Sequence, residues 1–237
     1  MHTTSKFAGI VLTLTALTAS AMTVGAGTAA ATEVVPVPPA KVLFIGDSIT
    51  ARYNNVTGSG NRGWWSYLAA DMKMTPVTSA QGRSGTLRRG GLNCVGTTFG
   101  DRLPDIAKTA PGVIVLAGGR NDAYYCLKGK TLRASRERTR VAVRDYFKKF
   151  AATVKAAKIP AKNVYVLTPW GSAAQADRTY IWTTYRTYAR QYGFQWVPVS
   201  YLTDTYTVDA THPNTPGNKK LYRMVRDASN LTKRFGA

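Results

Sequence analysis

One serine, one histidine and one aspartate have the residue types and the context of a hydrolytic catalytic triad. Ser48 follows Gly46-Asp47 at the end of an apolar run, but a serine hydroxyl is a weak nucleophile and needs a base within hydrogen-bond reach. The base expected here is His212, because the only other histidine, His2, lies in the leader segment discussed below. Asp209, three residues before His212, can turn back within one loop and accept the proton on the other ring nitrogen. We therefore predict that Ser48, Asp209 and His212 are catalytic.

The elements that must position these residues alternate between strand and helix. Short apolar runs are typical of buried parallel strands, and we expect strands at 41–45, 112–117, 163–168 and 194–199. A further strand is expected at 76–80. Amphipathic spacing and helix-terminus signals predict helices at 63–74, 134–159, 175–192 and 215–233, the last with Thr215 as its N-cap. This alternation predicts one three-layer α/β domain with a five-stranded parallel sheet.

Ligands of such sheets bind beyond the carboxyl ends of the strands, so the residues after each apolar run are the candidates for a site. Three blocks of glycine and polar residues stand directly after strands: Gly46-Asp47-Ser48, Gln81 to Gly85, and Gly118 to Asp122. A fourth, polar block, Asp209 to Asn214, precedes the last helix. The predicted topology therefore brings the triad residues to one edge of the sheet.

The order of these four blocks resembles that of the SGNH hydrolases, the GDSL esterase/lipase family. The blocks read Gly-Asp-Ser, a glycine in the second block, Gly-x-Asn-Asp, and Asp-x-x-His-Pro, and the resemblance runs from Lys41 to the last helix. It implies a flavodoxin-like α/β/α fold with strand order 2-1-3-4-5 and an esterase or lipase activity. Two departures are small: isoleucine follows Gly-Asp-Ser where the family name has leucine, and Gln81-Gly82 replaces an Asn-Ala-Gly, which leaves Gly85 as an alternative to Gly82.

The tetrahedral intermediate of ester hydrolysis needs hydrogen-bond donors for its oxyanion. We expect the backbone N–H groups of Ser48 and Gly82 and the side-chain amide of Asn121, and each such donor is typically worth about a hundred- to a thousandfold in rate. Every one of these residues also has a structural alternative. Ser48 would cap a helix, Asn121 would start one, Gly82 would permit a positive φ angle, and His212 would be an ordinary loop residue.

Three other interpretations do not fit. Gly58 to Gly63 matches the G-x-G-x-x-G dinucleotide fingerprint, but it does not directly follow a strand, and we expect a flexible loop there. The G-x-S-x-G elbow of the α/β-hydrolases is missing from the sequence, since Gly82-Arg83-Ser84-Gly85 is one residue short. A zinc-dependent deacetylase needs several histidine or carboxylate ligands, so one histidine is too few. We expect neither a metal nor a cofactor.

The N-terminus is typical of a secretory signal peptide. An uncharged apolar stretch from Phe7 to Val24 is followed by Ala29-Ala30-Ala31, which fits the A-x-A cleavage pattern, whereas the alternative is a membrane anchor. No later apolar run is long enough to span a membrane, so we expect a secreted or cell-envelope protein. The expected segments are a signal peptide (1–31), a Val/Pro-rich lead-in (32–40) and one catalytic domain (41–237).

Export would permit a disulfide, and Cys94 and Cys126 form the only possible pair within the chain. We expect this bridge, with two reduced, buried thiols as the alternative. With the strand order that the resemblance implies, the bridge would tie together the loops that present Gly82 and Asn121.

The net charge is strongly positive, with 32 Lys and Arg against 12 Asp and Glu, or +20. In an exported protein this favours anionic envelope polymers, acidic glycans or anionic lipids over nucleic acid as partners. Three arginines near the expected site are candidates to select an acidic or phosphate-bearing substrate: Arg83, Arg88 and Arg89. Five others on one predicted helix are interpreted as a solvated face: Arg133, Arg136, Arg138, Arg140 and Arg144.

Two classes of function remain. The first is an exported, monomeric serine hydrolase that cleaves acyl or O-acetyl esters of a glycan, a lipid or a small molecule, with acyl transfer to another hydroxyl as a variant. The second is a non-catalytic, basic envelope-binding protein on the same scaffold. A binding protein has no need of a complete set of catalytic residues, so Ser48, Asn121, Asp209 and His212 favour the hydrolase.

Overall fold

The computed structural model describes residues 40–51, 62–170 and 176–236. The expected signal peptide, nearly all of the expected lead-in and most of the Gly58 to Gly63 loop lie outside these ranges. None of the helices in the described ranges is long and apolar enough to cross a membrane.

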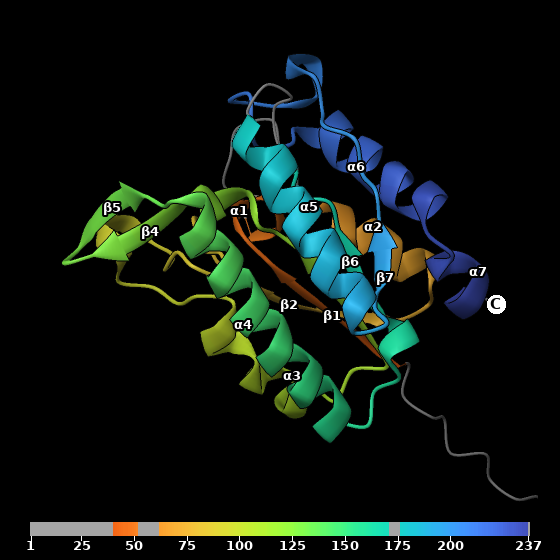
Figure 1. The fold of residues 1–237 in the computed structure, drawn as a ribbon. Helices are drawn as coiled ribbons and strands as arrows, with labels where there is room; N and C mark the ends of the chain where they lie inside the picture. Colours follow the sequence, from red (N-terminus) through yellow and green to blue (C-terminus); the bar gives the residue numbers. More distant parts are fainter. Residues whose placement is uncertain (1–39, 52–61, 171–175, 237) are drawn as a thin grey trace, which may run out of the picture. The chain divides into compact units, whose positions relative to one another are not determined.

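A five-stranded parallel sheet forms the centre of the fold, in the order β2-β1-β3-β6-β7 (Figure 1). Its strands are β1 (Lys41–Gly46), β2 (Thr75–Ala80), β3 (Val113–Ala117), β6 (Val164–Leu167) and β7 (Gln195–Val197). All five predicted strands and the predicted order are confirmed, with ends that differ by one or two residues, which is usual for strand boundaries.

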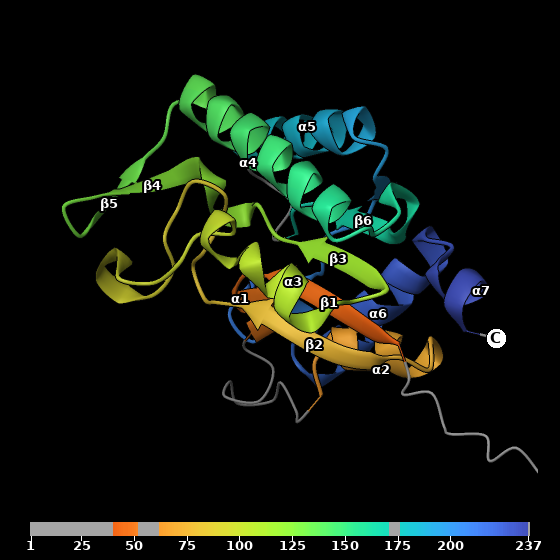
Figure 2. The ribbon, with the colours of Figure 1, turned by 90° about the horizontal axis from the view of Figure 1, so that it is seen from below.

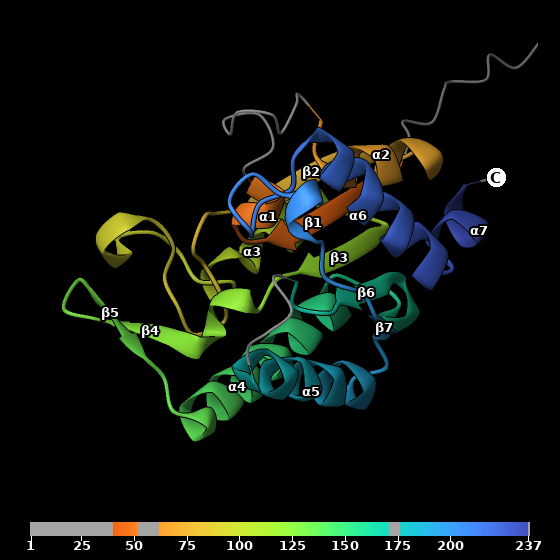
Figure 3. The same cartoon turned by 90° about the horizontal axis from the view of Figure 1, so that it is seen from above.

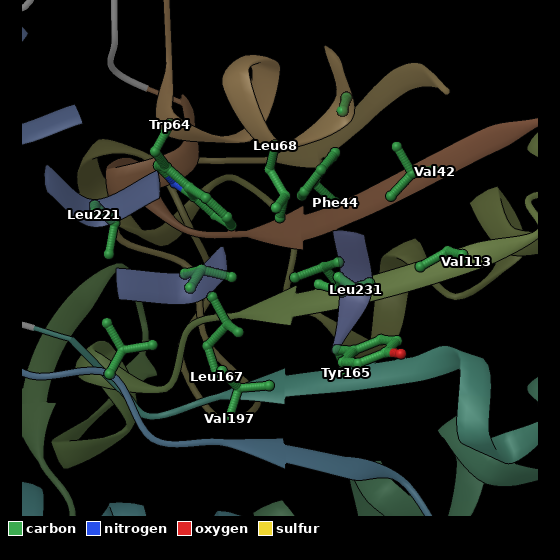
Figure 4. Close-up of a cluster of buried hydrophobic side chains, with 14 of the residues drawn as sticks. Val42, Phe44, Trp64, Leu68, Val113, Tyr165, Leu167, Val197, Leu221 and Leu231 are labelled. Atoms are coloured by element: carbon green, nitrogen blue, oxygen red, sulfur yellow. The ribbon is translucent and has the colours of Figure 1, made fainter. Parts of the chain in front are cut away.

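Helices cover both faces of the sheet, as Figures 2 and 3 show. The helices on one face are α2 (Trp64–Asp71), α6 (Thr215–Ala228) and α7 (Leu231–Phe235). Those on the other face are α3 (Pro104–Thr109), α4 (Arg136–Ala156) and α5 (Ala176–Gln191). Because side chains alternate along a strand, β1 supplies Val42 and Phe44 to the first core and Leu43 and Ile45 to the second. Figure 4 shows the first of these two cores, in which Phe44 packs edge-on against Trp64.

The last predicted helix is wrong in two respects. Its N-cap is Asn214, whose side chain accepts a hydrogen bond from Gly217 N at 2.8 Å, and Thr215 is the first helical residue. The helix is also interrupted, because Ser229 has extended backbone angles (φ −123°, ψ 167°) between α6 and α7. The interruption lets Asn230 accept a hydrogen bond from the Tyr165 hydroxyl at 2.8 Å and buries Leu231 in the first core.

A β-hairpin between β3 and α4 was not predicted. It comprises β4 (Tyr124–Leu127) and β5 (Lys130–Arg133), which pair with each other in a separate two-stranded sheet. Arg133 therefore ends a strand, and α4 begins only after Ser135, whose side chain accepts a hydrogen bond from Arg138 N. A disulfide between Cys94 and Cys126 joins this hairpin to the 3₁₀ turn η1 (Leu92–Cys94).

Candidate active site

Ser48 lies at the tight turn where β1 meets the short helix α1 (Ser48–Ala51). The turn is capped by Asp47 rather than by Ser48, since the Asp47 carboxylate accepts a hydrogen bond from Ile49 N at 2.9 Å. Gly46 is required for close packing, because a Cβ there would lie 2.4 Å from Thr50 Oγ1 and 3.2 Å from the Ala117 carbonyl. Ser48 is therefore the first helical residue, and its backbone N–H, like the others in a first helical turn, has no partner within its own helix.

The loop before α6 holds His212 in one orientation. Its ends are joined by a bridge between Thr207 and Pro213 and by a hydrogen bond from Val208 N to the His212 carbonyl at 2.9 Å. Asp209 Oδ1 accepts hydrogen bonds from the backbone N–H groups of Thr211 and His212, at 3.2 and 2.7 Å. These bonds build the loop around the Asp209 carboxylate.

The second carboxylate oxygen of Asp209 orients the imidazole. His212 Nδ1 lies 2.7 Å from Asp209 Oδ2, which favours the tautomer with the proton on Nδ1. Although burial acts to raise the pKa of Asp209, the hydrogen bonds from the His212 backbone and ring hold it below its ordinary value. His212 Nε2 is buried and has no hydrogen-bond partner among the described residues. The ring thus has a free acceptor nitrogen, as a general base requires.

The structure separates the two candidate oxyanion glycines. A Cβ on Gly82 would lie 3.8 Å from the Ser48 Cβ, so Gly82 adjoins the nucleophile. A Cβ on Gly85 would lie 2.1 Å from Asp122 Oδ1, so Gly85 is needed for packing against that carboxylate. Gly82, rather than Gly85, is therefore the glycine that lies beside Ser48.

Asn121 lies in the 3₁₀ turn η3 (Arg120–Ala123), so the structural alternative of a helical start also holds. Its amide Nδ2 donates to the Ser84 carbonyl at 3.0 Å, which ties η3 to the loop that contains Gly82. An amide group has two N–H donors, and this bond uses one of them. Asn121 thus has a structural role in joining η3 to the loop of Gly82, and it keeps a second N–H donor.

The structure assigns Asp122 a supporting role that the sequence did not reveal. Its buried carboxylate accepts hydrogen bonds from Thr86 Oγ1 at 2.8 Å, Leu87 N at 3.1 Å and the Tyr185 hydroxyl at 2.6 Å. Asp122 therefore clamps the loop after β2 onto the loop after β3.

Arg102 is a second residue that sequence reasoning missed. It is 8% exposed, and its guanidinium donates to the carbonyls of Gly46 at 3.0 Å and Ser79 at 2.9 Å, at the carboxyl ends of β1 and β2. It also donates to Ser84 Oγ at 2.9 Å. The backbone carbonyl of the same serine accepts the hydrogen bond from the Asn121 amide. Arg102 thus connects the turn before Ser48 with the loops of Gly82 and Asn121. No local sequence motif distinguishes Arg102 from the other arginines.

Substitutions of Arg102 test whether it aligns the catalytic loops in addition to stabilising the fold. We expect Arg102→Met to lower kcat about a hundredfold with little change in KM, because the oxyanion donors lose their mutual alignment. Unfolding free energy should fall by about 3 kcal/mol, since buried carbonyls lose a charged donor. Arg102→Lys keeps the charge but not the fork of donors, so partial recovery of kcat is expected.

The matched control is Arg89→Met, because Arg89 lies in the same region but forms an exposed ion pair with Asp101 at 3.6 Å. Steady-state kinetics and urea unfolding of the three variants provide the comparison. A stable Arg102→Met protein with wild-type kcat would contradict the positioning role.

Asp47 is a buried carboxylate one residue before Ser48, with 1% of its surface exposed. Burial raises its pKa to about 6, even though the Ile49 N–H and the charges of Arg120 and Arg102 act to lower it. The folded protein therefore retains this proton to a higher pH than the unfolded chain does. The resulting cost to stability is absent below about pH 4, grows between pH 4 and 6, and reaches about 3 kcal/mol above that range.

Asp47→Asn should remove this cost, because an amide oxygen can still accept the Ile49 N–H. We expect the stability of the variant relative to wild type to increase by about 3 kcal/mol from pH 4 to pH 7. Urea unfolding of both proteins across this pH range measures the difference in unfolding free energy. The other buried carboxylate, Asp122, is present in both proteins, so its contribution cancels in that difference. A stability difference that stays constant between pH 4 and 7 would contradict the assignment.

Arg120 links the third block to the histidine loop, through a hydrogen bond from Nη2 to Thr211 Oγ1 at 2.8 Å. The four blocks predicted from the sequence are thus held together by side-chain bonds from Arg102, Asn121 and Arg120. Within the described residues, no three His, Cys, Asp or Glu side chains are grouped as metal ligands. The predicted arginines Arg83, Arg88 and Arg89 belong to the loop after β2, where Arg88 donates to Thr131 Oγ1 of the hairpin at 3.1 Å.

Comparison with known proteins places this geometry in context. The model of one protein family, described as GDSL-like Lipase/Acylhydrolase, matches residues 42–225. A search of curated proteins finds no match.

Several solved structures share the fold. A family two carbohydrate esterase from Clostridium thermocellum, solved with cellohexaose, has a TM-score of 0.63 at 18% identity, covering 86% of this chain and 67% of its own. An acetyl xylan esterase from Butyrivibrio proteoclasticus has a TM-score of 0.59 at 15% identity, covering 85% and 66%. A putative acylhydrolase from Bacteroides fragilis has a TM-score of 0.55 at 18% identity, covering 84% and 91%. This chain thus spans about two thirds of the length of each carbohydrate esterase.

Proposed function

Because the chain belongs to the GDSL-like lipase/acylhydrolase family, it is a carboxylic ester hydrolase, and we propose that it works through an acyl-enzyme on Ser48. His212 Nε2 accepts the proton of the Ser48 hydroxyl as its oxygen attacks the ester carbonyl. Asp209 keeps the other ring nitrogen protonated and stabilises the imidazolium that forms. His212 then returns the proton to the departing alcohol, and a water molecule releases the acyl group by the same steps.

The oxyanion of each tetrahedral intermediate lies, in this proposal, among the backbone N–H groups of Ser48 and Gly82 and the amide of Asn121. These donors are fixed before the substrate arrives, by the Asp47 turn, by Arg102 and by the Asp122 clamp. Donors that need no rearrangement stabilise developing charge more effectively than water does.

A single observation carries the proposal: the 2.7 Å contact of His212 Nδ1 with Asp209 Oδ2, together with a buried Nε2 that has no partner in the described part of the chain. A structural histidine in a loop has no need of a carboxylate on one nitrogen and a vacant acceptor on the other. The non-catalytic alternative leaves this arrangement unexplained.

We further propose that residues 1–31 direct export and that residues 41–237 act as one catalytic domain on acyl or O-acetyl esters. The carbohydrate esterases that share the fold favour a glycan ester among the possible substrates. Transfer of the acyl group to another hydroxyl remains a variant of the same chemistry, because the acyl-enzyme does not determine its acceptor.

Covalent labelling tests the mechanism. A fluorophosphonate probe should modify the purified protein at one serine, and peptide mass spectrometry should locate the label on Ser48. Prior heat denaturation is the control and should abolish labelling. A panel of p-nitrophenyl esters from acetate to palmitate then defines the acyl preference. Labelling of another serine, or hydrolysis without any labelling, would overturn the proposal.

A further inference from the structure

We propose that the disulfide-tied lobe formed by residues 86–96 and 124–133 docks on the surface of an anionic lipid membrane. The lobe consists of the segment around η1 and the β4–β5 hairpin, joined by Cys94–Cys126. The proposal goes beyond the hydrolase function and does not depend on it, because docking requires no catalysis.

The first observation is exposed aliphatic surface. Among the described residues, five large hydrophobic side chains are exposed, and four of them belong to the lobe: Leu92 (67%), Val95 (81%), Leu127 (51%) and Leu132 (37%). Single exposed hydrophobic residues are ordinary on a protein surface, whereas a local concentration of them marks an interaction site.

The second observation is charge. The 21 lobe residues include no Asp or Glu and five basic residues: Arg88, Arg89, Lys128, Lys130 and Arg133. Leu127 is paired with Lys130 across the hairpin, so an aliphatic and a cationic side chain are neighbours on one face of the ladder. Long basic side chains can lie along an apolar surface and keep their charge at the polar headgroups. This combination fits the interface of an anionic bilayer.

The third observation is that the lobe is held in shape. Besides the disulfide, Arg88 donates to Thr131 Oγ1 at 3.1 Å, which connects the two segments. The hairpin closes through a two-residue turn at Lys128 and Gly129, both with positive φ. Side chains presented on a preformed surface lose less entropy on binding than those on a flexible loop.

The position of the lobe connects docking to the site. Figures 1, 2 and 3 show the hairpin and the yellow segment around η1 projecting from the same end of the fold, on the side where α1 lies. Both lobe segments follow directly on loops of the candidate site, after Gly85 and after Asn121. A membrane bound to the lobe would therefore lie beside Ser48.

The chemistry favours lipid over other occupants. Glycans are usually held by aromatic platforms and hydrogen bonds, whereas the exposed large hydrophobic side chains of the lobe are leucine and valine. The two tyrosines of the lobe, Tyr124 and Tyr125, are half-buried, and the guanidinium groups of Arg88 and Arg138 lie over their rings. A second copy of the chain would bring an equally cationic lobe against this one, and like charges repel. Aliphatic tips surrounded by cations match acyl chains beneath anionic headgroups.

Vesicle cosedimentation of the mature protein tests the proposal, with Ser48→Ala as background so that lipid hydrolysis does not interfere. We expect binding to phosphatidylcholine vesicles that contain phosphatidylglycerol and much weaker binding to phosphatidylcholine alone. Leu92→Ser with Val95→Ser should lower the partition coefficient by about tenfold or more at unchanged charge. Lys128→Asn with Lys130→Gln should lower binding to the anionic vesicles by about tenfold.

Two control variants match these changes outside the lobe. Tyr201→Ser removes the fifth exposed hydrophobic side chain, and Lys148→Gln with Lys149→Gln removes two exposed charges from α4. Both should bind as the Ser48→Ala background does. On the wild-type Ser48 background, the lobe variants should retain hydrolysis of soluble p-nitrophenyl acetate, which shows that they fold.

The outcomes are separable from those of the hydrolase proposal, since binding and ester hydrolysis are measured independently. Equal loss of binding in the α4 control would show that net charge alone is responsible and would overturn the docking surface. Unchanged binding of the Leu92/Val95 variant would overturn it as well. Sedimentation of the free protein as a dimer that dissociates in that variant would assign the lobe to a second copy instead.

Discussion

The Ser48→Ala variant should hydrolyse p-nitrophenyl acetate at least about ten thousandfold more slowly than the wild type, because no acyl-enzyme can form without the hydroxyl. The residual rate would come from the oxyanion donors and from substrate binding. Ser48 is small and lies at the first position of α1. Its hydroxyl forms no hydrogen bond with the other described residues, so the free energy of unfolding should change by less than about 1 kcal/mol. Initial rates and thermal unfolding provide the two measurements.

Ser66→Ala is the matched control for this variant. Ser66 is a partly buried serine of α2 whose hydroxyl donates to the Gly63 carbonyl at 2.8 Å, and it lies outside the four sequence blocks of the candidate site. Its replacement should leave the rate within about twofold of wild type. If Ser48→Ala folds normally and keeps more than a few per cent of the wild-type rate, Ser48 is not the nucleophile.

The second large effect should come from Asp209→Asn, with kcat lower by about ten thousandfold. The asparagine oxygen can still accept the backbone N–H groups of Thr211 and His212, so the loop should keep its shape. Its amide nitrogen would then face His212 Nδ1 and favour the tautomer with the proton on Nε2. A ring protonated at Nε2 cannot accept the serine proton.

Steady-state kinetics with Asp204→Asn as control would test this argument. Asp204 lies in the same loop region, in the turn η5 (Asp204–Tyr206), and is exposed. Its variant should retain wild-type kcat. A fall of less than tenfold for Asp209→Asn, with the loop intact by crystallography, would show that orientation of the imidazole does not depend on this carboxylate.

The sheet was predictable because its strands are buried on both faces. Residues Val42 to Ile45 are fully buried and supply both cores, so the run is apolar without alternation, as expected for a central parallel strand. The edge strand β2 has three exposed residues out of six and contains Thr75, Thr78 and Ser79, so its apolar signal is weaker.

Other parts of the fold depend on contacts that no local pattern records. The break at Ser229 is determined by Asn230 reaching Tyr165, which lies 65 residues earlier in the chain. The β4–β5 hairpin has its own sheet and adds nothing to the central one, so the strand–helix alternation gave no reason to expect it.

The same distinction applies to the site. The triad and the oxyanion candidates could be predicted because they stand in short blocks, three at strand ends and one before the last long helix. Their catalytic roles stay predictions for the experiments above. Arg102 could not be found in this way, because its partners are the carbonyls of two strands that meet only in the folded sheet. The choice between Gly82 and Gly85 likewise required the position of Asp122.

The disulfide has a consequence for the unfolded chain as well. Cys94 and Cys126 are 32 residues apart, and the chain between them includes the central strand β3. Closing a loop of this length lowers the entropy of the unfolded ensemble, which in the chain-entropy description raises the free energy of unfolding by roughly 3 to 4 kcal/mol. Because β3 pairs with β1 on one side and β6 on the other, that gain applies to the whole sheet. The oxidation of two peripheral sulfur atoms would thus change the ratio of folded to unfolded protein by roughly several hundredfold.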